Sequence, residues 1–144
     1  VHFTHYIVAH AHFGAYAFVT MILFGLFYYM IPRLTGREWP CSALIRVHFW
    51  AAAVGITGYV VSLSVGGWWQ GRMMNNPDVP FARIVLYLQP HLFARTLCGI
   101  LIGIGHAAFA TSFVMNLSGW GKRRTGPTYF TEPPPTCPPE PPNG

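Results

Sequence analysis

From Tyr6 to Ile31 the chain carries no acidic side chain, lysine or arginine, and the histidines of this run are His10 and His12. A helix over this run would be roughly 39 Å long at about 1.5 Å per residue, while a bilayer core is about 30 Å thick. Pro32 follows and favours an end to the helix. Because only helices and closed barrels satisfy their backbone in lipid, the run predicts a transmembrane helix.

Two further apolar runs are long enough to span a bilayer, and each contains one arginine, Arg46 and Arg95. The sequence predicts spans over 6–31, 44–65 and 92–117, the second ended by Gly66 and Gly67 and the third by Gly119 and Gly121. The apolar residues 81–88 predict a separate short helix at the membrane interface. The expected fold is therefore all-α and integral to the membrane, with three transmembrane helices over residues 1–121 forming the C-terminal part of a larger bundle.

The charge pattern supports a membrane location and excludes nucleic acid as a partner. Charged residues make up 9% of the chain, against about 25% in soluble domains. The net charge of +5 comes from basic residues placed between the apolar runs, as the positive-inside rule describes. The predicted cytoplasmic side carries Arg33, Arg37, Arg46, Lys122, Arg123 and Arg124, and the opposite side carries Arg72, Arg83 and Arg95. Residues 122–144, basic and then proline-rich, are expected to be a disordered cytoplasmic tail.

His10 and His12 are two positions apart, inside a predicted membrane span. A helix turns about 100° per residue, so the two side chains point roughly 200° apart. They therefore face opposite sides and cannot chelate one small metal ion. If both bind a metal, they serve two separate centres, one on each side of the helix.

Two interpretations of this pair remain open from spacing alone. Each histidine could be buried and hydrogen-bonded to a neighbouring helix. Alternatively, two flat cofactors could flank the helix, each bound through an imidazole, as haem iron is. The His10 face continues through Gly14, Ala17 and Met21. The small residues Gly14 and Ala17 leave room for a planar macrocycle or for a packed helix.

Longer stretches resemble a known family. HFTHYIVAHAHFGAYAF is similar to the helix of the haem–copper oxidase catalytic subunit that carries the HxH ligand pair. In order, YYMIPRLTGREWP, RVHFWAAAVGITGYV, WWQG and FARTLCGILIGIGHAAFA resemble the C-terminal helices of subunit I of cbb3-type cytochrome c oxidase. The resemblance covers roughly residues 1–120.

The resemblance implies roles for individual residues. His10 would be the axial ligand of the high-spin haem b3, and His12 an axial ligand of the low-spin haem b. His2 would lie in the propionate region, and Arg95, at the outer end of the third span, would pair with a haem propionate. The resemblance assigns no role to His5.

The remaining intramembrane histidines have simpler interpretations. His106 lies within the third span and is expected to be a hydrogen-bonded interior residue rather than a ligand. His48 lies near the predicted cytoplasmic end of the second helix and is expected at the interface. No carboxylate lies within a span, and no hydrolase motif is present.

For the parent protein the resemblance implies a terminal respiratory oxidase that oxidises cytochrome c, reduces O2 to water and moves protons across the bacterial inner membrane. Copper B, with three histidine ligands, would be bound by sequence preceding Val1, so this chain alone is not expected to be active. Expected partners are the upstream part of subunit I, membrane-anchored c-type cytochrome subunits and the bilayer. A nitric oxide reductase large subunit and a non-enzymatic diheme electron conduit remain alternatives.

Overall fold

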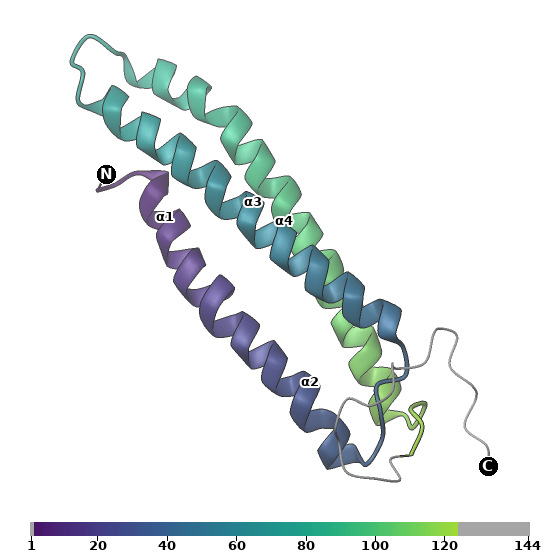
Figure 1. Ribbon diagram of the computed structural model, residues 1–144. Helices are drawn as coiled ribbons and strands as arrows, with labels where there is room; N and C mark the ends of the chain where they lie inside the picture. The colour runs from purple at the N-terminus through teal and green to yellow at the C-terminus, as the bar shows by residue number, and fades with distance from the viewer. Residues whose placement is uncertain (1, 124–144) are drawn as a thin grey trace.

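The computed structural model describes residues 2–123, which fold into helices arranged side by side (Figure 1). The elements are α1 (His5–His12), the π-helix η1 (Phe13–Thr20), α2 (Met21–Thr35), α3 (Ser42–Met74) and α4 (Phe81–Leu117). The first three follow one another without interruption and form one long arm, while α3 and α4 pack along each other in opposite directions. Within the described residues there is no strand, so the all-α prediction is confirmed.

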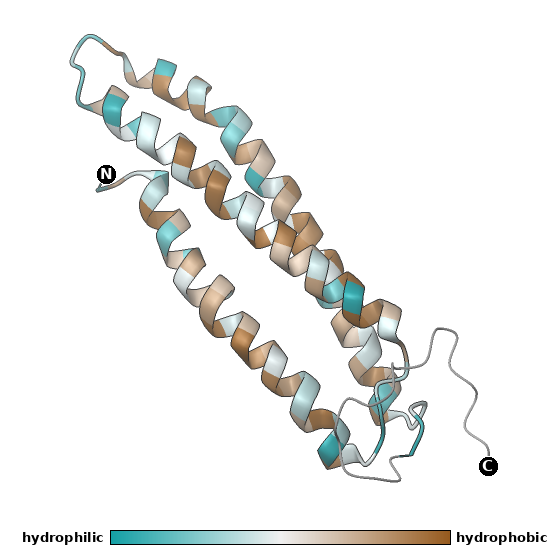
Figure 2. Ribbon diagram, viewed as in Figure 1, coloured by the Kyte–Doolittle hydropathy of each residue, from teal (hydrophilic) through white to brown (hydrophobic). Residues whose placement is uncertain are grey.

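Three helical stretches are long and apolar enough to cross a bilayer, namely His5–Thr35, Ser42–Met74 and Phe81–Leu117. Figure 2 shows apolar residues distributed around these helices rather than along one inner face. Phe18, Ile22 and Trp50 are examples of large apolar side chains that are more than half exposed. A water-soluble bundle would bury such side chains, so this surface suits lipid or further apolar helices.

Gly66 and Gly67 do not end the second helix, contrary to the prediction, because α3 continues to Met74. Both glycines are buried at close contacts. A Cβ atom on Gly67 would lie 2.8 Å from the carbonyl carbon of His5, and one on Gly66 would lie 2.9 Å from the His91 ring. The pair therefore allows α3 to approach α1 on one side and α4 on the other.

Residues 81–88 do not form a separate interfacial helix, because α4 begins at Phe81 rather than at Leu92 and continues through Pro90. Proline removes a backbone donor and usually breaks a helix. Here Ile84 and Leu88, before the proline, are buried in the bundle, and Ser62 of α3 donates to the His91 carbonyl oxygen at 2.9 Å. Packing on both sides of the proline keeps α4 continuous.

The first long helix also continues past its predicted stop. Pro32 lies inside α2, which ends at Thr35, and Gly36 follows with a left-handed φ of 65°. Glycine adopts this conformation without steric cost and is the usual residue after a helix end. The stop signal is thus the glycine rather than the proline.

The segment after α4 is attached to the loop between α2 and α3. Arg37 Nη1 donates to the carbonyl oxygens of Gly119 and Gly121, at 2.5 and 3.1 Å. The Glu38 amide donates to the Lys122 carbonyl oxygen at 2.9 Å. Lys122 and Arg123, which the sequence assigns to the tail, are therefore held against this loop. The remainder of the predicted tail, 124–144, lies outside the described residues.

Candidate functional site

His10 and His12 lie on the last turn of α1, and both side chains are exposed. Ala9, beside them, is fully buried, and α1 packs mainly against α3. Within the described residues, the His10 side chain forms no hydrogen bond, and His12 bonds mainly to its own helix. Among the described residues, only His12 of the two contacts a neighbouring helix, through Tyr59 of α3 at 3.4 Å.

The tautomer of His12 is determined by its own helix. Its Nδ1 atom lies 2.8 Å from the carbonyl oxygen of Val8. A carbonyl oxygen only accepts, so in the neutral ring Nδ1 carries the proton and Nε2 holds the free electron pair. Metal-binding histidines are commonly oriented by such a bond from the second ring nitrogen. The Nε2 atom points away from α1, and its contact with the Tyr59 hydroxyl is long, at 3.4 Å.

The π-helix η1 follows His12 directly and leaves its surroundings open. None of its residues is buried, and an added Cβ at Gly14 would meet no atom within 4 Å among the described residues. π-helical turns are rare and often occur at functional sites. Two exposed imidazoles on opposite faces, one with an oriented Nε2, have the chemistry to bind two flat metal-bearing groups such as haems, and the Tyr59 ring is the neighbour on the His12 side.

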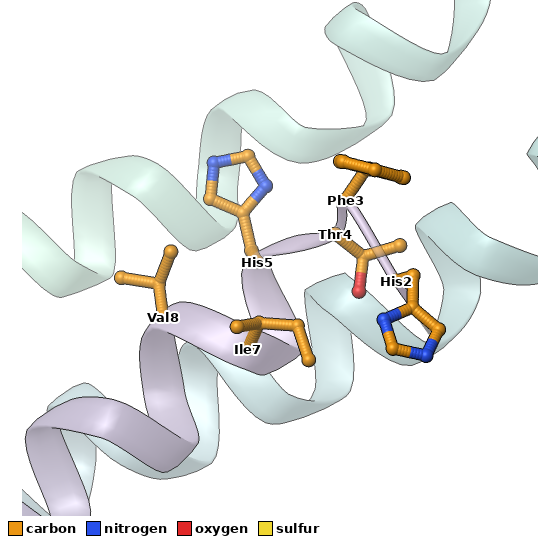
Figure 3. A pocket seen from close by; sticks show the side chains of 6 residues that line it. All are labelled: His2, Phe3, Thr4, His5, Ile7 and Val8. Atoms are coloured by element: carbon orange, nitrogen blue, oxygen red, sulfur yellow. The ribbon is translucent and has the colours of Figure 1, made fainter.

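His2 and His5 lie at the start of the chain, beside a hollow of about 460 Å³ (Figure 3). The hollow is lined by His2, Phe3, Thr4, His5, Ile7 and Val8. His5 is anchored to α3, because its backbone amide and its Nδ1 lie 2.9 and 2.8 Å from Gln70 Oε1. His2 is exposed and remains available to an acidic group, whereas His5 is held in place by Gln70.

Arg95 is half-buried and lies well inside α4, not at its outer end, because α4 begins at Phe81. The position of Arg95 along the bundle axis follows from the contacts between α3 and α4 before and after it. Ser62 bonds to the His91 carbonyl oxygen, and a Cβ on Gly58 would lie 2.7 Å from Cys98 Sγ. Arg95 is therefore at the level of Tyr59, which contacts His12. Among the described residues Arg95 forms no ion pair or hydrogen bond, so its charge is left for another partner.

A cluster of aromatic and histidine side chains lies farther along the bundle, and sequence reasoning did not find it. Its rings come from α2, α3, α4, η1 and the α2–α3 loop: Tyr16, Phe24, Tyr28, Trp39, His48, His106 and Phe109. His48 is 1% exposed, so its expected interfacial position is wrong. His106 is hydrogen-bonded to Tyr16, as expected. Because these residues lie far apart in sequence, no local spacing signals the cluster.

Comparison with known proteins identifies the family. The sequence profile of the family described as Cytochrome C and Quinol oxidase polypeptide I matches residues 1–101. This chain belongs to that family. It is accordingly a haem–copper oxidase subunit I homologue and, given its three apolar helices, part of a multi-pass membrane protein.

Curated members of the subunit I family resemble the chain over half of its length or more. A "Cytochrome c oxidase subunit 1 homolog" from Agrobacterium tumefaciens (strain T37) is 34% identical over 125 residues, which are 82% of this chain. "Cytochrome c oxidase subunit 1" of Rhodobacter capsulatus is 34% identical over 111 residues, 72% of this chain. "Cbb3-type cytochrome c oxidase subunit CcoN1" of Stutzerimonas stutzeri is 40% identical over 73 residues, 50% of this chain.

The match covers only part of these relatives. The chain spans 23%, 21% and 15% of the lengths of the Agrobacterium, Rhodobacter and Stutzerimonas proteins. No solved structure matches the chain. The family membership therefore concerns the matched segment, and the activity of a complete protein has to be inferred.

Proposed function

We propose that this chain is the C-terminal part of subunit I of a terminal respiratory oxidase, which oxidises cytochrome c, reduces O2 to water and translocates protons. The observation that carries the proposal is the pair His10 and His12, exposed on opposite faces of α1, in a chain of the subunit I family. His10 would hold the high-spin haem b3 and His12 the low-spin haem b. When bound, haem iron supplies electron transfer and oxygen chemistry.

The residues of this chain would bind and orient the two groups. The hydrogen bond from His12 Nδ1 to Val8 keeps Nε2 free to bind iron. The single helix between the two ligands fixes the distance between the haems, which favours a short electron-transfer path. Arg95, at the level of His12 and unpaired among the described residues, is suited to a propionate, and His2 is a second candidate for the propionate region.

A cbb3-type complex is the subtype that we favour. The Stutzerimonas relative, named as a cbb3-type subunit, has 40% identity over half of this chain. Copper B and its ligands would then be held by another part of subunit I, and c-type cytochrome subunits would deliver electrons. The location would be the bacterial inner membrane, with the basic end of the bundle, including Arg37 and Lys122, on the cytoplasmic side.

The relatives' names favour an oxidase over the two alternatives. The relatives described above are named cytochrome c oxidase subunits, and none is named a nitric oxide reductase or a diheme conduit. A nitric oxide reductase would share the HxH helix but carry a non-haem iron site elsewhere. A diheme conduit would bind two haems without copper or non-haem iron.

A pyridine haemochrome assay on the complete complex tests the ligand assignment. The complex with both histidines should contain two b-type haems in this subunit. His10→Ala should perturb the high-spin haem and His12→Ala the low-spin haem, because the two rings face opposite sides. If neither variant loses haem or changes its spectrum, the pair is not a ligand pair and the proposal fails.

A further inference from the structure

One side of α3 is exposed along most of the helix. The exposed residues recur every three or four positions, so at about 100° per residue they form a stripe roughly 100° wide. Arginine lies at both ends of the stripe, tryptophan lies one turn farther in at each end, and valine or threonine lies between. We call this set the α3 stripe, and its members are Arg46, Trp50, Val54, Thr57, Val61, Val65, Trp68 and Arg72.

The α3 stripe presents an apolar surface between its two tryptophans. Trp50 and Trp68 are 62% and 55% exposed, and the valines between them are exposed as well. The polar member of this part is Thr57, whose Oγ1 donates to the carbonyl oxygen of Ala53 at 2.8 Å. Its hydroxyl proton is therefore already bonded within the helix. A continuous apolar surface of this kind is unfavourable in water and requires an apolar neighbour.

The dimensions of the α3 stripe match those of a bilayer. Trp50 and Trp68 are separated by roughly 27 Å along the helix at about 1.5 Å per residue, and a hydrocarbon core is about 30 Å thick. Arg46 and Arg72 are separated by roughly 39 Å, close to the thickness of about 40 Å that includes the headgroup regions. Tryptophan is enriched at both membrane interfaces. Among the described helices, only α3 contains tryptophan.

The opposite face of α3 shows what a protein-covered face looks like in this chain. It packs against α4 and α1 through buried small residues, which are Ala51, Ala52, Gly55, Gly66 and Gly67. A Cβ atom on Gly55 would lie 3.1 Å from the Cys98 carbonyl oxygen, so the two helix backbones approach closely there. Small residues of this kind are typical of helix–helix contacts in membranes.

The α3 stripe lacks this feature, because it contains no glycine, alanine or serine. Its β-branched and indole side chains keep a second helix backbone at a distance. Acyl chains of lipids adapt their shape to such a surface, whereas a rigid helix has to match it. The composition of the stripe therefore favours lipid over a further helix as its neighbour.

The two arginines at the ends of the stripe are suited to phosphate groups. Arg46 and Arg72 are exposed, and neither forms an ion pair or a hydrogen bond within the part of the chain that the structure describes. The Arg72 guanidinium lies over the Trp69 ring, 5.2 Å from its centroid, which holds it beside the aromatic residues. A guanidinium binds a phosphate through two parallel hydrogen bonds. The charges thus complement lipid headgroups at both surfaces of a bilayer.

We propose that the α3 stripe faces membrane phospholipid in the complete complex. Acyl chains cover the valines, Trp50 and Trp68 lie at the two interfaces, and Arg46 and Arg72 bind lipid phosphates. The helix α3 then lies at the perimeter of the complex, and its hydrocarbon-embedded part is 50–68 rather than 44–65. This inference goes beyond the proposed function, because it does not depend on the ligands of either haem.

The test places the photoreactive amino acid p-benzoylphenylalanine at position 61, in place of Val61. The complete complex is reconstituted in vesicles of phosphatidylethanolamine and phosphatidylglycerol and illuminated. Mass spectrometry should find phospholipid attached to the α3 peptide, because position 61 lies near the middle of the apolar part of the stripe. A cross-link to another polypeptide segment, or the absence of a lipid adduct, would overturn the proposal.

Phe109 provides the control position for this experiment. Its ring lies among protein rings, with centroids 4.8 Å from that of Phe24 and 5.2 Å from that of His48. The same photoreactive residue in place of Phe109 should cross-link to protein. Lipid adducts as abundant there as at position 61 would show that capture does not mark a lipid-covered face, and the proposal would fail.

A substitution that enlarges the side chain tests the same face without photochemistry. Val61→Phe should leave the thermal midpoint of the complete complex unchanged, because lipid yields to a larger side chain. Ala52→Phe is the matched control, since Ala52 is fully buried, and overpacking there should lower the midpoint by several degrees. An equal decrease in both complexes would mean that protein covers the α3 stripe and would overturn the proposal.

Cysteine labelling in sealed vesicles tests the depth of the stripe. Arg46→Cys and Arg72→Cys should react with a water-soluble maleimide from opposite sides of the membrane. Val61→Cys should react at least about tenfold more slowly, because a thiol in hydrocarbon does not ionise. Labelling of the native cysteines is measured in the unsubstituted complex and subtracted. Equal rates for Val61→Cys and Arg72→Cys would place the stripe in water and overturn the proposal.

Discussion

The side chain of His12 is hydrogen-bonded to the backbone of its own helix, with Nδ1 2.8 Å from the carbonyl oxygen of Val8. The bond spans one helical turn and therefore needs no other element. It leaves Nε2 on the outward side, where the Tyr59 ring lies with its centroid 4.8 Å from that of His12. The Nε2 atom is thus oriented by local structure, and the tyrosine is only a neighbour.

Tyr59→Phe tests this division of roles. The variant removes the 3.4 Å contact of the hydroxyl with Nε2 but leaves the bond to Val8. We expect the complete complex to retain the same amount of low-spin haem, measured by the pyridine haemochrome assay. Loss of that haem would contradict the view that the helix backbone alone sets the tautomer.

Gly67→Ala should destabilise the complex. Its new Cβ would lie 2.8 Å from the His5 carbonyl carbon, so α1 must move away from α3. Overpacking of this kind costs about 1–3 kcal/mol. Gly103→Ala is the control, because its Cβ would meet no described atom within 4 Å, and alanine favours a helix by about 1 kcal/mol over glycine. Thermal denaturation of both complexes measures the difference, and equal midpoints would contradict the prediction.

Asn116→Ala should weaken the attachment of α4 to the α2–α3 loop. Asn116 is fully buried, and its Nδ2 donates to the carbonyl oxygens of Arg37 and Glu38 at 3.3 and 3.0 Å. Loss of these bonds removes a partner from two carbonyl groups in a part-buried setting, at a cost of about 1–3 kcal/mol. Limited proteolysis of the loop should become faster. Asn75→Ala, at an exposed site, should change stability by less than about 0.5 kcal/mol.

Arg95→Leu should lower the midpoint potential of the low-spin haem. The positive charge favours the reduced haem, which carries one positive charge fewer than the oxidised form. At about 10 Å and an effective dielectric constant near 20, the interaction is roughly 1–2 kcal/mol, which corresponds to tens of millivolts. A spectroelectrochemical titration measures the shift.

Arg33→Leu is the control for Arg95, because Arg33 lies near the far end of the first long helix and is bonded to the Tyr29 carbonyl oxygen. Its removal should leave the potential within a few millivolts, since salt screens exposed charges beyond about 10 Å. An unchanged potential in Arg95→Leu would remove Arg95 from the propionate region.

Local patterns were sufficient for the class of fold and for the relative direction of His10 and His12. Long apolar runs predicted three membrane-crossing helices, because lipid requires each backbone group to be satisfied within its own segment. The opposite faces of His10 and His12 follow from the rotation of about 100° per residue. Neither result depends on how the helices pack.

Helix ends and side-chain partners were determined by the tertiary structure. Gly66 and Gly67 are stop signals in a local interpretation, yet close packing against α4 and α1 makes them interior residues of α3. The same holds for His48, expected at the interface but buried beside His106. Such contacts join residues far apart in the chain, so their energies depend on the packing of whole helices. The sequence by itself determined the helices and the opposite directions of His10 and His12, whereas packing decided what surrounds them.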